Sequence, residues 1–102
     1  MVTNADLLEP IDVLDRLRGL ELTLGQVCGV AGITKMQLDL WTERGSIATL
    51  GVKQRLYNVD AVEHVMLIAQ ARDLGFSVDA AIEAAAAFRS RGASHQAKRI
   101  AA

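Results

Sequence analysis

The chain has 102 residues, of which 51% are apolar, and its formal net charge is −1. This length fits one domain with a modest core, and the charge does not by itself indicate a nucleic-acid binder, although a local basic patch is compatible with it. The single cysteine excludes an internal disulfide, and no apolar run reaches the length of a membrane span. Without a signal-like N-terminus, we expect a cytoplasmic protein, and abundant alanine favours a mainly helical fold.

Residues 1–20 are predicted to form an N-terminal helical extension. Residues 1–9 are expected to fray, whereas Pro10 suits the first position of a helix because its missing N–H needs no partner there. The apolar residues that recur at helical spacing are Ile11, Leu14 and Leu17. Gly19 can end this helix, which either packs on the domain or serves as an arm for an interaction.

A first short helix is predicted after Thr23, whose hydroxyl can cap it, and Gly32 can end it. The residues that share its apolar face are Leu24, Val27, Cys28 and Ala31. Cys28 is therefore expected in the core, and neither a second cysteine nor a nearby histidine is present to form a metal site with it.

A second helix is predicted to open at Thr34 and to end before Gly45. Thr34 and Gln37 fit a capping box, in which the threonine oxygen accepts from the amide of Gln37 and the glutamine side chain reaches back. Leu38 and Trp41 lie three residues apart on one face, so both are expected to point into the core.

Two short strands over residues 47–50 and 54–57 are predicted to form a hairpin with its turn at Gly51. A hairpin that follows two short helices has the outline of a wing. Lys53 and Arg55 would lie near its end, where two cations add little to folding. Their placement therefore favours a contact with an anionic partner.

Two longer helices are predicted to complete the fold. Asn58 can cap the third helix, and Ser77 can cap a fourth that continues through an alanine-rich run to about Arg91. Gly92 is expected to break the fourth helix, which leaves residues 92–102 as a short C-terminal tail.

Several short stretches follow one another in an order that is typical of one protein family. They are Leu22–Val27 (LTLGQV), Ala31–Thr34 (AGIT), Leu38, Gly45, Arg55–Tyr57 (RLY) and Arg72–Ser77 (RDLGFS). With this order of elements, residues 22–90 resemble the DNA-binding domain of the MerR family. The resemblance implies a mainly α fold over residues 21–91, a winged helix-turn-helix with a small two-stranded β wing and two further C-terminal helices.

The resemblance also implies double-stranded DNA as a partner, with the second helix in the major groove and the wing on the flanking backbone. The candidate DNA-contacting residues are Thr34, Lys35, Gln37, Arg44, Lys53, Gln54 and Arg55. Arg55 stands at the family's wing arginine position. It is the first choice for a phosphate contact, which is the main source of affinity in such proteins.

The second helix departs from the family pattern in charge. Typical members carry arginines where this chain has Met36, Asp39 and Glu43. Two carboxylates on a groove-facing surface repel phosphates unless they pair internally or read cytosine amino groups. Lys35 could pair with Asp39 one turn away, which is worth only about 0.2–0.5 kcal/mol. From Lys35 to Arg55, four cations face two anions, so the local bias is positive but small.

A second departure from the family is length. Family regulators usually continue into a long coiled-coil dimerisation helix and an effector region, whereas only residues 92–102 follow the fourth helix here. We therefore expect an effector-less protein without cofactor or metal, similar to small developmental regulators and phage excisionases. A homodimer or cooperative self-association through apolar surface of the helices is compatible with the pattern.

Two functions fit these residues. The leading hypothesis is a small DNA-binding regulator of transcription or recombination. The alternative is an adaptor similar to the chaperone-modulator proteins, which bind the J-domain of a co-chaperone and share Cys28, Gly32-Ile33 and an acidic second helix. In that case Asp39 and Glu43 would meet a basic protein surface.

An enzyme is not expected from this sequence. His64 and His95 lie far apart along the chain, and His64 is expected at the surface beside Glu63. No glycine-rich phosphate loop and no nucleophile–base spacing is present.

Overall fold

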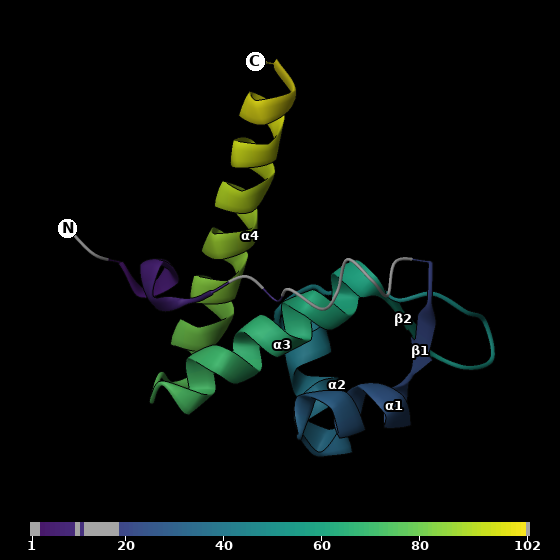
Figure 1. Ribbon diagram of the computed structural model, residues 1–102. Coiled ribbons are helices and arrows are strands. Elements are labelled where there is room, and N and C mark those ends of the chain that lie inside the picture. The colour runs from purple at the N-terminus through teal and green to yellow at the C-terminus, as the bar shows by residue number, and fades with distance from the viewer. Residues whose placement is uncertain (1–2, 10, 12–18, 102) are drawn as a thin grey trace.

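The computed structural model describes residues 3–9, 11 and 19–101, with the backbone alone for residues 92–101. Its elements are η1 (Asn4–Leu7, a 3-10 helix), β1 (Glu21–Thr23), α1 (Leu24–Ala31), α2 (Lys35–Arg44), β2 (Leu56–Asn58), α3 (Val59–Asp73) and α4 (Val78–Ala101). Figure 1 shows this mainly helical arrangement, which confirms the expected winged helix-turn-helix with two further helices. The helix expected between Pro10 and Gly19 lies largely outside the described residues.

The core is built around α3. α4 packs against one end of α3, and α1 and α2 pack against it nearer to the sheet (Figure 1). The buried residues of α3 are Val59, Ala61, Val62, Val65, Leu67, Ile68 and Ala71. α4 contributes small residues, Ala81, Ala84 and Ala85, which allow the two helix axes to approach closely. Trp41 and Tyr57 are the largest fully buried side chains and anchor the helix-turn-helix to this core, as expected for Trp41.

Both short helices begin at capping boxes, because a threonine and a glutamine stand three residues apart. In α2, Thr34 Oγ1 accepts from Gln37 N at 3.1 Å, and Gln37 Oε1 accepts from Thr34 N at 3.0 Å. Thr23 and Gln26 repeat this geometry in α1. Gly32 ends α1 with a φ of 68°, a left-handed conformation that glycine adopts without strain. The predicted turn between the helices is thus confirmed.

The two-stranded sheet forms from different segments than the sequence suggested. β1 pairs with β2 in antiparallel register, with Leu22 opposite Tyr57. Residues 47–49 form no strand, and Leu50 alone bridges Leu56 through two backbone hydrogen bonds of 2.8 Å. The prediction of a strand over 47–50 was wrong because β1 is too short to show an alternating pattern, so the true partner of β2 was not recognised.

α4 does not break at Gly92. The helix continues to Ala101, and its C-terminal part extends past the rest of the fold (Figure 1). A single glycine in a helix costs only about 1 kcal/mol relative to alanine, and the neighbouring residues are good helix formers. The expected separate tail over residues 92–102 is therefore a continuation of α4 as far as Ala101.

The N-terminal segment from Thr3 to Glu9 is ordered, whereas the sequence led us to expect fraying. Ala5 and Leu8 are buried. The backbone N–H of Glu9 donates to Gln70 Oε1 on α3 at 2.8 Å. In the middle of the segment, Asp6 forms an ion pair with Arg91 of α4. These contacts connect the segment to both long helices, although no local pattern in the sequence encodes them.

His64 is more buried than expected for a surface residue. Its Nε2 is inaccessible to solvent and has no hydrogen-bond partner in the described part of the protein. Burial, and secondarily the positive charge of Arg89, lowers the pKa of His64 to about 4. The imidazole is therefore neutral at physiological pH. Among the described helices, none combines the length and apolar character that a membrane-spanning segment requires.

Candidate nucleic-acid interface

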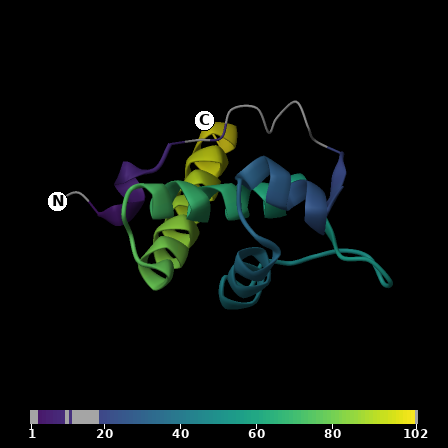
Figure 2. The same cartoon turned by 90° about the horizontal axis from the view of Figure 1, so that it is seen from below.

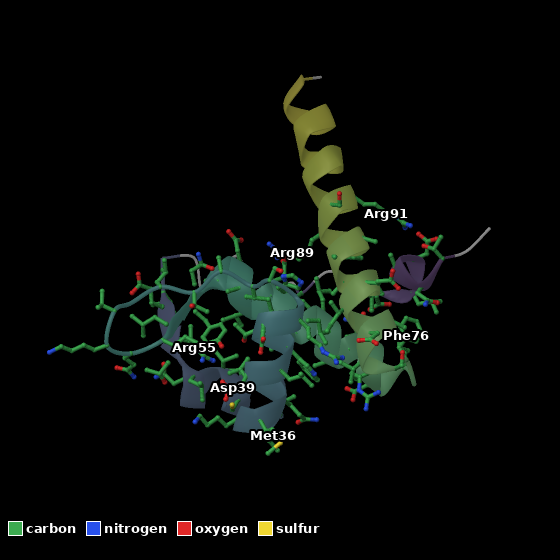
Figure 3. All side chains as sticks on the ribbon, turned by 180° about the vertical axis from the view of Figure 1, so that it is seen from behind. Met36, Asp39, Arg55, Phe76, Arg89 and Arg91 are labelled. Carbon is green, nitrogen blue, oxygen red and sulfur yellow. The ribbon has the colours of Figure 1, made fainter. Side chains whose placement is uncertain are left out.

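α2 presents an outward face that carries no free cation. Leu38 and Trp41 turn into the core, which directs Met36, Leu40 and Glu43 toward solvent. Met36 is 81% exposed and points away from the fold at the end of the molecule (Figure 3). The outward face of α2 is therefore apolar and acidic over its central turns.

The wing is a loop, Gly51–Arg55, closed at its base by the Leu50–Leu56 bridge. Gly51 has a φ of +89°, and a Cβ atom at this position would lie 2.1 Å from the carbonyl oxygen of Gln54, so the turn requires glycine. Figure 2 shows the loop extending away from the helices beside α2. Val52, Lys53 and Gln54 of this loop are exposed, Val52 fully so.

Arg55 folds back from the wing onto α2. Its Nη1 atom donates to Asp39 Oδ1 at 2.6 Å, and the two side chains retain exposed fractions of 38% and 42% (Figure 3). The sequence had suggested Lys35 as the partner of Asp39, but Lys35 forms no ion pair with any described residue. The wing cation therefore neutralises the carboxylate of α2 that was expected to oppose DNA binding.

A chain of hydrogen bonds continues from Arg55 into the core. Arg55 Nη1 also donates to the Tyr57 hydroxyl at 3.3 Å, and the Tyr57 and Thr42 hydroxyls lie 2.7 Å apart. Thr42 donates its only hydroxyl proton to the carbonyl of Leu38 at 2.6 Å, so Tyr57 must donate to Thr42. Hydrogen bonds to Tyr57 and to Asp39 raise the pKa of Arg55 above its ordinary value. The base of the wing is thus fixed to α2 by charged and neutral bonds together.

The other predicted residues of α2 are partly occupied within the fold. Thr34 and Gln37 bond to each other in the capping box, which occupies the Gln37 amide oxygen. Arg44 Nη1 donates to Asp79 Oδ1 of α4 at 2.8 Å. Lys35 is exposed at the start of the helix.

The charges that remain near the interface are few. Arg55 cancels Asp39 and Arg44 cancels Asp79, which leaves Lys35 and Lys53 against Glu43. The structure therefore brings Arg55 to the recognition helix, while it directs Arg44 toward α4. The positive bias that the sequence suggested persists, but it rests on two lysines.

Sequence reasoning missed the residues that hold this surface together. Tyr57 was assigned only to the wing, and no role was expected for Thr42. Neither the Thr42–Tyr57 contact, 15 residues apart, nor the Arg44–Asp79 contact, 35 residues apart, has a local signal. The two-residue spacing of Arg55 and Tyr57 in the predicted strand over residues 54–57 was the available hint. Within the described part of the chain, no three His, Cys, Asp or Glu side chains gather as a metal site.

Comparison with known proteins bears on this arrangement directly. The family model described as MerR HTH family regulatory protein matches residues 22–87, which span α1, α2, the wing, α3 and the first part of α4. No significant match was found among curated proteins or among solved structures. The family match covers most of the chain and coincides with the helix-turn-helix and wing. The chain therefore belongs to the MerR family of helix-turn-helix regulatory proteins, which are DNA-binding regulators of transcription.

Proposed function

We propose that this protein is a regulator that binds duplex DNA with α2 in the major groove and the wing on the adjoining backbone. The observation that carries the proposal is the 2.6 Å bond between Arg55 and Asp39. It neutralises one of the two carboxylates that oppose the approach of α2 to DNA. It also fixes the wing beside α2, so that one rigid surface offers both elements.

Lys53 and Lys35 are the proposed phosphate contacts, because each is exposed and lies on one of the two DNA-facing elements. Arg55 is a third, since more than a third of its side chain is exposed beside Asp39. Each neutralised phosphate contributes about 0.9 to the slope of log K against log salt. Three contacts give a slope of about −3, which corresponds to weak binding by one copy. We therefore expect a homodimer or several cooperating copies on a natural site, in transcription or in recombination.

A mobility-shift series with the full chain and a mixed-sequence duplex at low salt tests the proposal. Lys53→Ala should weaken binding several-fold on every sequence and flatten the salt dependence by about 0.9. Lys98→Ala is the matched control, because Lys98 lies in the part of α4 that extends away from the wing (Figure 1). If no duplex is shifted at any micromolar concentration, the DNA-binding proposal is lost.

A protein-binding adaptor is the second candidate, favoured by the exposed Met36 and Val52. Large apolar side chains in water are typical of protein interfaces. Glu43 adds an acidic group that suits a basic partner. For this function, Met36→Ala should abolish binding to a purified basic partner while the protein shifts no duplex. If the protein is a DNA-binding regulator, it should instead shift duplex DNA and bind no such partner.

A further inference from the structure

We propose that Met36 and Glu43 select the DNA sequence, with Met36 contacting the methyl group of a thymine and Glu43 accepting from the amino group of a cytosine. This inference rests on the proposed function, because it assigns the bases that the same surface reads. It concerns the outward face of α2, which has an unusual composition for a helix that enters DNA.

The outward face of α2 lacks the side chains that recognise guanine. The most common specific contact in the major groove is an arginine or lysine on guanine O6 and N7. No cation lies on the outward face between Met36 and Glu43, because Arg44 bonds to Asp79 and Lys35 stands at the helix start. Guanine recognition by the centre of α2 is therefore not available.

Adenine recognition is also restricted. Glutamine reads adenine by a two-point contact in which its amide oxygen accepts from N6 and its amide nitrogen donates to N7. The amide oxygen of Gln37 already accepts from the backbone of Thr34 at 3.0 Å, and this bond caps the helix. A two-point contact to adenine would therefore compete with the bond that caps α2.

The side chains that remain match the other two bases. Met36 is 81% exposed on the outward face, and an apolar side chain in the major groove contacts the C5 methyl group of thymine. Glu43 is exposed on the same face, and its carboxylate accepts no hydrogen bond from any described residue. A carboxylate in the major groove accepts from the N4 amino group of cytosine.

The spacing of the two residues defines the spacing of the two bases. Met36 and Glu43 are separated by two helical turns, or about 10.5 Å along the axis. Base pairs are about 3.4 Å apart along one strand. A helix lying along the groove runs obliquely to the duplex axis, so it places a thymine and a cytosine about two to three base pairs apart.

The test begins with selection of bound sequences from a randomised duplex pool by the full-length protein. The selected site should contain thymine and cytosine at this separation. Replacing that thymine with uracil removes only the methyl group and should weaken binding about five- to tenfold, near the lower end for one mismatched pair. Met36→Ala should lose the same factor on thymine and show no further loss on uracil, because one contact accounts for both effects.

Two further variants complete the experiment. Glu43→Gln should remove the preference for cytosine at its position and raise binding to unrelated duplexes. Leu74→Ala is the matched control for Met36→Ala, because Leu74 is 51% exposed at the end of α3 and should leave thymine discrimination intact. Equal binding to thymine and uracil duplexes by the unmodified protein would overturn this inference and leave DNA binding standing. Failure to bind any duplex would overturn both.

Discussion

The guanidinium of Arg55 and the carboxylate of Asp39 form a 2.6 Å ion pair that joins the wing to the recognition helix. The two residues are separated by 16 positions in the sequence and belong to the two elements that we propose to contact DNA. Their pairing explains how a helix with two acidic residues is compatible with that role. The ion pair also limits the contact that Arg55 can make with a DNA phosphate. The consequences can be measured.

Asp39→Ala should strengthen DNA binding. The substitution removes a negative charge from α2 and frees Arg55 from competition with Asp39, so the salt slope should stay near −3 while low-salt affinity rises about five- to tenfold. The pair is too exposed to contribute more than about 1 kcal/mol to stability. Titrations of one duplex at several salt concentrations measure both quantities.

Glu63→Ala provides the control for that substitution. It also removes one carboxylate and releases an arginine, Arg89, but the pair connects α3 to α4 away from the wing. DNA affinity should change little in this variant. If Asp39→Ala instead weakens binding, then the ion pair acts by positioning the wing rather than by restraining Arg55.

Tyr57→Phe should destabilise the fold by about 1 kcal/mol, because it removes one hydroxyl that bonds to both Thr42 and Arg55. Thr42→Val removes the Thr42 hydroxyl, which is the other partner of the Thr42–Tyr57 hydrogen bond. The double variant should lose less stability than the sum of the two single variants, since they share one bond. Chemical denaturation of the four proteins gives the coupling energy, and strict additivity would contradict the hydrogen-bond chain.

Gly51→Ala should distort the wing. The position has a φ of +89°, and the added Cβ would meet the carbonyl of Gln54. The left-handed conformation alone costs about 1–2 kcal/mol for a residue other than glycine. We expect a loss of DNA affinity with a modest loss of stability, measured by mobility shift and by thermal melting.

Gly29→Ala is the control for Gly51→Ala. Gly29 lies in α1 with open space around its Cα atom, so alanine should raise stability by about 0.5–1 kcal/mol and leave DNA binding unchanged. A similar loss of affinity in both variants would show that the effect of Gly51→Ala does not arise from the wing.

Stability should fall as the pH drops from about 6.5 to about 4, because of His64. Burial and the charge of Arg89 lower its pKa in the folded protein to about 4, whereas the unfolded chain takes up the proton near 6.5. The unfolded state therefore binds more protons in this window, and the loss reaches at most about 3 kcal/mol below pH 4.

His64→Leu should flatten this part of the stability profile, which denaturation at a series of pH values measures. The pKa of Asp6 is lowered, chiefly by its hydrogen bond to the backbone of Thr3, so its contribution is lost below about pH 3.8 and lies outside the window. If the free energy of unfolding of the His64→Leu variant still falls with the same slope between pH 6.5 and 4, other groups cause the loss of stability.

The sequence by itself determined the helices and the family. Thr34 and Gln37 stand three residues apart, and that spacing sets the start of α2 wherever the rest of the chain lies. Leu38 and Trp41 share a face for the same local reason, and both are buried as predicted. The resemblance of residues 22–90 to the MerR family agrees with the family match over residues 22–87. Contacts between residues three or four positions apart in a helix depend only on that spacing, which can be read from the sequence.

Only the tertiary structure decided which charges meet. Lys35 is one helical turn from Asp39 and was the local choice of partner. Arg55 nevertheless pairs with this carboxylate, because the pairing of β2 with β1 holds the wing against α2. The tertiary structure also pairs Arg44 with Asp79, which leaves Lys35 and Lys53 as the cations of α2 and the wing that form no ion pair with a described residue. An exposed i, i+4 pair is worth only a few tenths of a kcal/mol, so a well-aligned partner from a distant segment readily replaces it. The helices could therefore be predicted from the sequence, whereas the charge of the surface formed by α2 and the wing could not.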